Sequence, residues 1–362
     1  MPGAETARKL AGNARMVTTR RAYDKHFDAF AAYCEEAGVC ALPATKSTVF
    51  NYVGFLAEGG RWAADSLQPI FSAINSAHRD YEFDPPAVDN YFLQQARTGL
   101  RRAQVEAGHT RDTRVPLPCE AILQIIAVGE AAADELDSSE SQFESEQVLA
   151  VLRAAFGISL TSLFAGRQDS GVHLRTEDFG VDGAHMWLRL TEKGKKGRVL
   201  RRILKLSLSG TSSAVHRIAD LGARYCRART RLRNWGQADP EYLLQLQGES
   251  RPVTRHMETW LASLLDQLGI SAPAGFAYQG HSIRSMGASA MAAIGVARHT
   301  YVWVGGWARG STVVDKHYID PTFTPSPAAH DLYGWLLTHS YAAGIGVHSA
   351  GTALPDPWLE AG

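Results

Sequence analysis

Residues 280–296 have the sequence GHSIRSMGASAMAAIGV, and this stretch decides the fold. It begins with a histidine and an arginine three positions apart, His281 and Arg284, and then continues with small and apolar residues. The run predicts a helix of small residues over 285–294. Taken alone, the His-x-x-Arg pair is a weak signal, because so short a motif occurs by chance in many proteins.

Other polar groups lie on both sides of this stretch. Upstream, an apolar helix predicted over 148–165 ends at the sequence LFAGR, in which the arginine is Arg167. Two strand-like segments, 185–190 and 199–206, flank the basic glycine-containing turn EKGKKG and predict a β-hairpin. Downstream, VGGWARGSTVV contains Trp307 and HYID contains Tyr318. Each signal is weak by itself, since an arginine at a helix end can simply complement the helix dipole.

The order of these groups resembles the catalytic domain of the tyrosine recombinases, also called the phage integrase family. The matching positions are Arg167, the hairpin residue Lys193, His281, Arg284, Trp307 and Tyr318. The resemblance implies a mainly α fold with a small β-sheet (α+β), in which a helical core-binding domain and a catalytic domain form a C-shaped clamp on DNA. It also implies a site-specific DNA recombinase that cleaves and rejoins strands through a 3′-phosphotyrosyl intermediate, without metal or ATP.

The remaining sequence divides in a way that fits this resemblance. Four short amphipathic helices are predicted over 19–37, 46–58, 64–79 and 87–105. The polar, proline-bearing sequence GHTRDTRVPLP is typical of an interdomain linker. An acidic, serine-bearing stretch over 134–146 is expected to be a surface excursion between two helices. The expected domains are a flexible N-terminus (1–16), a core-binding domain (17–107), a linker (108–118), a catalytic domain (119–345) and a flexible tail (346–362).

These residue types suit metal-free cleavage of DNA. Arg167 and Arg284 would hold the phosphate, because a planar guanidinium group binds two phosphate oxygens and keeps its charge. Tyr318 would attack the phosphorus, since two nearby guanidinium groups favour its phenolate form. The phosphotyrosyl ester would preserve the broken bond, so that rejoining needs no ATP.

The other positions receive their roles from the resemblance. Lys193 would be the general acid for the leaving 5′ oxygen, with Lys195 and Lys196 as alternatives. His281 would assist proton transfer or hold the phosphate, since an imidazole can do either near neutral pH. Trp307 stands where many relatives have histidine, and its indole N–H can donate to a phosphate oxygen but cannot shuttle a proton.

Two departures from the family pattern leave questions open. The stretch between Trp307 and Tyr318 is slightly longer than usual, so Tyr301 and Tyr333 compete with Tyr318 as the nucleophile. The family usually has an acidic residue three positions after the first arginine; that position is a serine here, and the neighbouring Asp169 is a candidate substitute.

The charge is unevenly distributed, although 37 basic residues balance 37 acidic ones over the chain. Residues 120–147 contain eight acidic and no basic residues, whereas residues 148–251 contain 18 lysines and arginines against nine acidic residues. The basic segment could follow a phosphate backbone, or it could be a surface balanced by the acidic stretch, and charge alone does not decide. The predicted DNA contacts are Arg97, Arg101, Arg102, Arg111, Arg114, Lys195, Lys196, Arg198, Arg201 and Arg202.

Several classes of protein are not expected. The four cysteines lack zinc-site spacing, so free thiols, no metal and no cofactor are expected. No apolar run approaches the roughly 18 residues of a membrane span, and no signal peptide precedes the first helix. We therefore expect a soluble protein of the bacterial cytoplasm (associated with the nucleoid) or, in a eukaryote, of the nucleus.

The resemblance also implies partners. These are double-stranded DNA with a specific recombination site and a homotetramer on synapsed DNA, while the free chain would be a monomer or weak oligomer. No membrane partner is expected. The residues after Tyr318, with a helix expected over 328–338, would pack either on a neighbouring subunit or on their own domain. The alternatives are a related strand transferase (telomere resolvase or type IB topoisomerase), a catalytically inactive DNA-binding protein of the same fold, or an unrelated helical protein.

Overall fold

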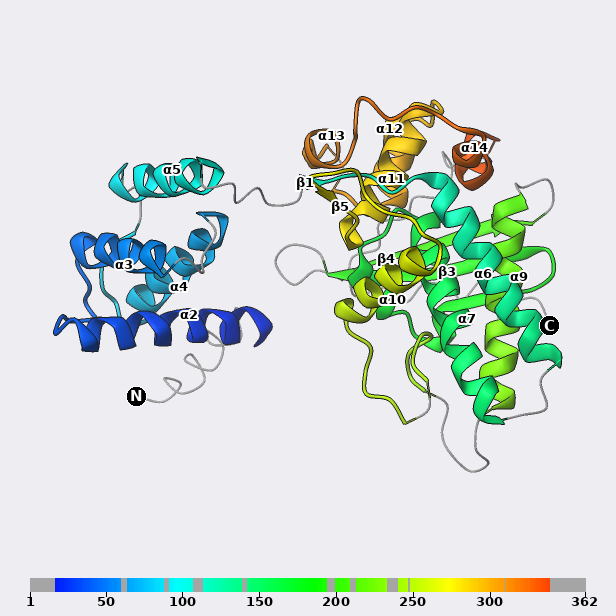
Figure 1. The fold of residues 1–362 in the computed structure, drawn as a ribbon, viewed down its shortest axis with the longest axis horizontal. Coiled ribbons are helices and arrows are strands. Elements are labelled where there is room, and N and C mark those ends of the chain that lie inside the picture. The colour runs from blue at the N-terminus through cyan, green and yellow to red at the C-terminus, as the bar shows by residue number, and fades with distance from the viewer. Residues whose placement is uncertain are drawn as a thin grey trace, which may run out of the picture. The chain divides into compact units, whose positions relative to one another are not determined.

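The computed structural model divides into two compact units, residues 1–111 and 112–362 (Figure 1). It describes residues 17–59, 64–87, 91–106, 113–138, 142–193, 199–208, 213–232, 240–246, 248–308 and 310–338. The flexible ends expected at 1–16 and 346–362 lie outside these ranges, so those two expectations stay predictions.

The described residues of the first unit form four α-helices, which confirms the helices predicted for it. They are α2 (Val17–Glu36), α3 (Lys46–Glu58), α4 (Leu67–Asp80) and α5 (Tyr91–Glu106), with a 3₁₀ turn, Ala64–Ser66, before α4. The side chain of Thr45 accepts a hydrogen bond from the Thr48 N–H and caps the start of α3. Phe30, Tyr52 and Leu67, from three of the helices, are almost fully buried in one core.

The second unit contains three long helices that run alongside one another: α6 (Cys119–Ser138), α7 (Gln142–Leu163) and α9 (Ser213–Arg231) (Figure 1). The expected surface excursion over 134–146 was wrong, because both α6 and α7 extend into it. Leu136 continues the apolar face of α6 and is fully buried, which keeps this end of the helix on the core.

An antiparallel sheet of three strands lies against these helices. Its order is β2 (Phe179–Val181), β3 (His185–Lys193) and β4 (Val199–Ser207), with His185 paired to Ser207 and Lys193 to Val199. The predicted hairpin is confirmed, whereas β2 was missed because three residues carry little periodic signal. Leu188 and Leu204 lie opposite each other and are buried, so one face of the hairpin packs on the core.

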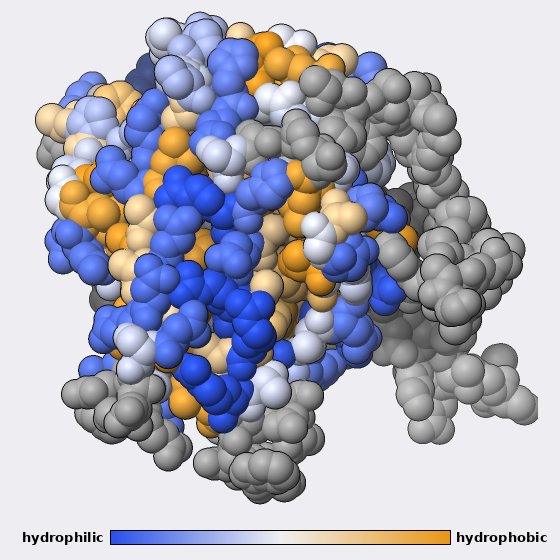
Figure 2. Space-filling view, turned by 90° about the vertical axis from the view of Figure 1, so that its right-hand side faces the viewer, coloured by the Kyte–Doolittle hydropathy of each residue, from blue (hydrophilic) through white to orange (hydrophobic). Residues whose placement is uncertain are grey.

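Ion pairs between α6 and α9 join two of the basic residues to three of the acidic residues noted in the sequence. Arg217 binds both carboxylate oxygens of Glu130, at 2.7 and 2.6 Å. Arg224 binds Asp134 at 2.6 Å and Asp137 at 2.8 Å. The face of the molecule in Figure 2 carries hydrophilic residues across its middle, with hydrophobic patches between and beside them. The acidic stretch therefore neutralises basic residues within the same unit.

The rest of the second unit consists of short elements. They are β1 (Thr113–Arg114), α8 (Gln168–Val172), a 3₁₀ turn (Thr176–Asp178), α10 (Thr254–Gln267), β5 (Phe276–Ala277), α11 (Gly280–Ala293), α12 (Arg298–Val304), α13 (Val313–His317), α14 (Pro327–Tyr333) and α15 (Trp335–Thr338). Strand β1 pairs in parallel with β5, and Leu117 is fully buried. Residues 113–118 of the expected linker thus pack on the second unit.

The helices after α13 fold back on their own unit. Ala329, Leu332 and Tyr333 are fully buried, and the Ser213 hydroxyl bonds the Asp331 carboxylate at 2.8 and 2.9 Å. Of the two expectations for this region, packing on the own domain holds for residues 327–338.

One helix in the described ranges is long and apolar enough to span a bilayer. It covers Ser145–Leu163 within α7, so the expectation that no apolar run has this length was wrong. However, 72% of its most apolar window is buried inside the unit, where α7 packs against α6, α9 and α10.

The packing of α9 gives a first prediction. A Cβ atom at Gly222 would lie 2.3 Å from the Phe179 ring and 2.7 Å from the Phe156 ring. We expect Gly222→Ala to lower the free energy of unfolding by about 1–3 kcal/mol in urea titrations. Gly54→Ala, in open space on α3, should instead stabilise the first unit by about 0.5–1 kcal/mol. An unchanged urea midpoint of unfolding for Gly222→Ala would contradict the close packing of Gly222 against the two phenylalanine rings.

The cysteines give a second prediction. Burial and the neighbouring Glu120 raise the pKa of the Cys119 thiol to about 12, and burial also raises the pKa of Cys34 and Cys226. Because the thiolate is the reactive form, these three should react slowly with a thiol reagent at pH 8. The exposed Cys40 should react first. The rapid labelling should disappear in Cys40→Ser; labelling of native Cys119 as fast as Cys40 would contradict its burial.

Candidate active site

A buried arginine lies at the centre of the second unit. Arg284, in the second turn of α11, is 2% exposed, and its Nη1 donates to the Ala165 carbonyl at 2.7 Å. Ala165 has a φ of 43°, in the left-handed region that few residues other than glycine adopt. A buried cation needs compensating partners, and this carbonyl provides one. The bond joins α11 to the loop that follows α7.

Small residues allow this close approach. A Cβ atom at Gly287 would lie 2.6 Å from the Cβ of Ala165 and 3.0 Å from the Tyr333 hydroxyl. Any larger residue would push α11 away from the loop and move Arg284. The glycine and alanine content of residues 280–296 therefore has a structural reason, which is to bring the helix against the backbone of its neighbours.

Two aromatic rings lie against Arg284, and a third stacks on one of them. Its Cζ atom lies 3.8 Å from the ring centroid of Trp307 and 5.1 Å from that of Tyr318, both favourable cation–π distances. The Trp307 and Tyr318 rings meet edge to face, with centroids 5.4 Å apart. The ring of His281 stacks on Tyr318 at 6.2 Å. Four of the six predicted catalytic residues thus form one cluster.

The indole of Trp307 carries an unused hydrogen-bond donor. Its Nε1 is buried, and it has no acceptor within the described part of the chain. A buried donor without an acceptor costs about 1–3 kcal/mol, which native proteins rarely tolerate without a reason. A bound acceptor at this point would remove the cost.

The other two predicted catalytic residues are less fully described. Arg167 follows Ala165 by two positions and precedes α8; its side chain is exposed, and its guanidinium makes no hydrogen bond or ion pair with any described residue. Lys193 is the last residue of β3, and its side chain lies outside the described residues. The alternatives Lys195 and Lys196 lie outside them as well.

The predicted DNA contacts fall on several elements. Arg97 on α5 is half-buried and donates to Gln68, at 3.0 Å, whereas Arg101 and Arg102 on the same helix are exposed. Outside the described residues lie Arg111 and Arg198 and the side chains of Arg114, Arg201 and Arg202.

The competing tyrosines have different surroundings from Tyr318. Tyr333 is fully buried and donates to the Ser162 carbonyl at 2.8 Å, and burial raises its pKa well above the usual value. Tyr301 is 6% exposed, and burial and the nearby Asp315 raise its pKa. Tyr318 is half-buried beside Arg284. Burial and charge thus favour Tyr318 as the nucleophile.

Two further groups lie near the ends of the loop that follows α7. Asp169, the suggested substitute for the family's acidic residue, pairs with His173 at 3.0 Å, and its side chain is 68% exposed. The carbonyl of Ala165, which binds Arg284, was missed altogether. A backbone carbonyl leaves no signal in the residue pattern, so no inspection of the sequence could have found it.

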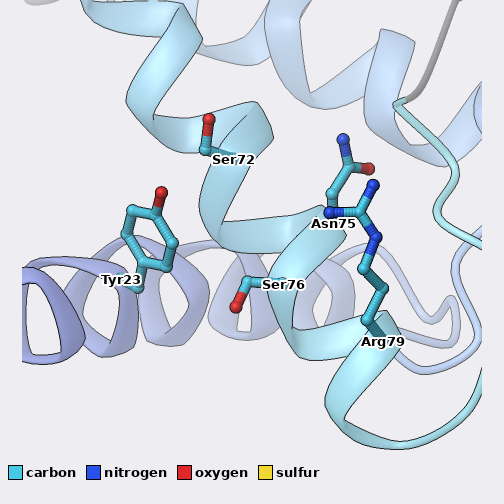
Figure 3. Close-up of a pocket in the computed structure, with 5 residues that line it drawn as sticks. All are labelled: Tyr23, Ser72, Asn75, Ser76 and Arg79. Carbon is cyan, nitrogen blue, oxygen red and sulfur yellow. The ribbon is translucent and has the colours of Figure 1, made fainter. Parts of the chain in front are cut away.

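The first unit has a polar depression of its own, between α2 and α4. Figure 3 shows its lining residues, which are Tyr23, Ser72, Asn75, Ser76 and Arg79. The Asn75 side chain already accepts a hydrogen bond from the Ala87 N–H, at 2.9 Å. Hydroxyl, amide and guanidinium groups can bind polar ligands, but none of the predicted catalytic residues lines this depression.

Comparison with known proteins gave similarity in structure alone. No protein-family model and no curated protein sequence matches the chain. Among solved structures, a lambda integrase tetramer bound to a Holliday junction has a TM-score of 0.53 and 13% identity, over 86% of this chain and 74% of the other. A lambda integrase(75-356) dimer bound to a COC′ core site has a TM-score of 0.52 and 13% identity, over 88% and 94%. The chain therefore has the α+β fold of lambda integrase, a tyrosine recombinase.

Proposed function

We propose that this protein is a site-specific DNA recombinase, which breaks and rejoins DNA through a covalent bond between Tyr318 and a phosphate. One observation carries the proposal: the half-buried ring of Tyr318 lies beside the buried guanidinium of Arg284, between Trp307 and His281. The fold shared with lambda integrase supports it. A phenol held next to a fixed cation is the arrangement that attack on a phosphodiester requires.

Three donors would hold the phosphate. Arg284 is fixed in place by the Ala165 carbonyl and so presents its charge without reorganisation. Arg167 has an exposed guanidinium that can bind two phosphate oxygens. The indole N–H of Trp307 would donate to a phosphate oxygen, which would satisfy the buried donor.

The reaction would conserve the number of phosphate ester bonds. The Tyr318 oxygen attacks phosphorus, the bond from phosphorus to the 5′ oxygen breaks, and the DNA 3′ end remains attached to the tyrosine. Lys193, with Lys195 and Lys196 as alternatives, supplies the proton to the 5′ oxygen. His281 takes the phenol proton or holds the phosphate. Rejoining reverses these steps and needs neither ATP nor a metal.

The proposal extends to DNA binding and assembly. Both units would bind the duplex, with the exposed Arg101 and Arg102 of the first unit on phosphates. Lambda integrase is described both as a tetramer on a Holliday junction and as a dimer on a core site. By analogy, we propose a homotetramer of this chain on synapsed DNA, a monomer or weak oligomer in the free state, and a location in the cytoplasm on the nucleoid or in a nucleus.

A suicide substrate tests the proposed nucleophile. A duplex that contains the recombination site and a nick close to the cleavage point should trap a covalent protein–DNA adduct, visible as a shifted band on a denaturing gel. We expect Tyr318→Phe to abolish the adduct while DNA binding persists, because the phenol oxygen forms the bond.

Two matched variants serve as controls. Tyr301→Phe and Tyr333→Phe remove the competing hydroxyl groups and should leave the adduct in place, although Tyr333→Phe also loses a buried hydrogen bond. An adduct that persists in Tyr318→Phe and disappears in one of the controls would reassign the nucleophile. DNA binding by the wild type without any adduct would identify an inactive DNA-binding protein.

Another prediction concerns the indole of Trp307. Trp307→Phe keeps an aromatic ring beside Arg284 but removes the N–H donor, so we expect single-turnover cleavage to slow by roughly 10- to 100-fold at saturating DNA. Trp307→His, which retains a donor, should recover part of the rate.

The control for this variant is Trp335→Phe. It also loses a buried indole donor, here bonded to the Leu332 carbonyl at 2.9 Å, but it lies in α15. Its cleavage rate should match the wild type. Equal rates for Trp307→Phe and the wild type would show that the indole N–H does not act on the phosphate.

A further inference from the structure

A buried serine on α11 holds the main chain of the proposed nucleophile. Ser289 is 1% exposed, and its hydroxyl donates to the Tyr318 carbonyl at 3.1 Å. The same hydroxyl accepts the Asp320 N–H at 2.8 Å. One side chain therefore spans the backbone on both sides of Ile319.

A hydroxyl group is well suited to this position. It is both a donor and an acceptor, so a single serine satisfies the carbonyl of Tyr318, the C-cap residue of helix α13, and the N–H of Asp320 just beyond it. Alanine would have nearly the same volume but would leave both groups without this partner. The neighbouring residues Ala288 and Ala290 are equally buried and apolar, which makes the serine an exception within this part of α11.

A second contact holds the chain just before the tyrosine. Arg298, at the start of α12, binds the Asp315 carboxylate through Nε at 3.2 Å and through Nη2 at 2.5 Å. Its Nη2 also donates to the Ser311 carbonyl at 2.6 Å. The guanidinium lowers the pKa of the Asp315 carboxyl. An ion pair this exposed adds little stability on its own. It does hold residues 311–315, which precede Tyr318, against the start of α12.

We propose that Ser289 is a positioning residue that sets the location of Tyr318 relative to Arg284, and that the Arg298–Asp315 pair supports it from the other side. Ser289 and Arg284 belong to the same helix, α11, five positions apart. The helix thus holds both the guanidinium and the backbone of the attacking residue. The inference rests on the proposed function, since the placement matters for cleavage only if Tyr318 attacks DNA.

The test combines kinetics with a measurement that needs no catalysis. In Ser289→Ala we expect single-turnover cleavage of the nicked substrate to slow by roughly 10- to 100-fold, because a displacement of about 1 Å at a reacting group can cost that much. The dissociation constant for DNA should change less than threefold. In the free protein, hydrogen exchange of the Asp320 amide should accelerate.

Three variants control for a general loss of structure. Ser162→Ala removes an equally buried hydroxyl, which bonds the Ser159 carbonyl at 2.6 Å, and should cleave at the wild-type rate. Ser289→Thr keeps the hydroxyl and should cleave faster than Ser289→Ala. Arg298→Gln removes the pair with Asp315 and the hydrogen bond to the Ser311 carbonyl, and we expect a slowing of roughly 3- to 10-fold, smaller than that of Ser289→Ala.

The outcomes distinguish a failure of the positioning role of Ser289 from a failure of the proposed recombinase function. If the wild type forms the adduct and Ser289→Ala forms it at the same rate, the positioning role is overturned and the recombinase proposal stands. The role is also overturned if Ser162→Ala slows cleavage as much as Ser289→Ala does. If the wild type forms no adduct, the proposed function fails and the positioning role fails with it, whatever the exchange rate of Asp320 shows.

Discussion

The burial of one charged side chain organises the second unit. A guanidinium that is 2% exposed would be costly without partners, and Arg284 finds them in the Ala165 carbonyl and in the rings of Trp307 and Tyr318. These partners come from three separate segments. Ala165 adopts a left-handed backbone conformation and Gly287 has no side chain, and both features allow these segments to come into contact. The proposed catalytic cluster and the core of the unit are therefore one structure.

Charge in this protein has two separate uses. Arg217 and Arg224 bind carboxylates of α6 and so neutralise part of the charge of the basic middle segment within the unit. Arg101 and Arg102 of α5 and Arg167 in the second unit are exposed. The total charge therefore says little about DNA binding, because the position of each cation decides whether a phosphate could reach it.

The contact that Ser289 makes with its main chain distinguishes Tyr318 from the two competing tyrosines, Tyr301 and Tyr333. Tyr333 uses its hydroxyl to bind the Ser162 carbonyl in the core, and Tyr301 is buried near a carboxylate. The ring of Tyr318 is half-buried, and its carbonyl is held by Ser289 from the helix that carries Arg284. The three phenols are chemically identical, so the difference in their suitability for attack arises from solvation, charge and anchoring.

Local patterns in the sequence determined the elements and the candidate residues. The helix over 46–58 and the β-hairpin follow from periodicity and turn residues, which neighbouring positions carry by themselves. The set from Arg167 to Tyr318 follows from the resemblance to the tyrosine recombinases. The tertiary structure decided the rest: the extension of α6 and α7 into 134–146, the Ala165 carbonyl beneath Arg284, the internal pairing of α6 and α9, and the Ser289 contact with Tyr318. These features depend on groups that are distant along the chain or on backbone atoms, and only packing brings such groups together.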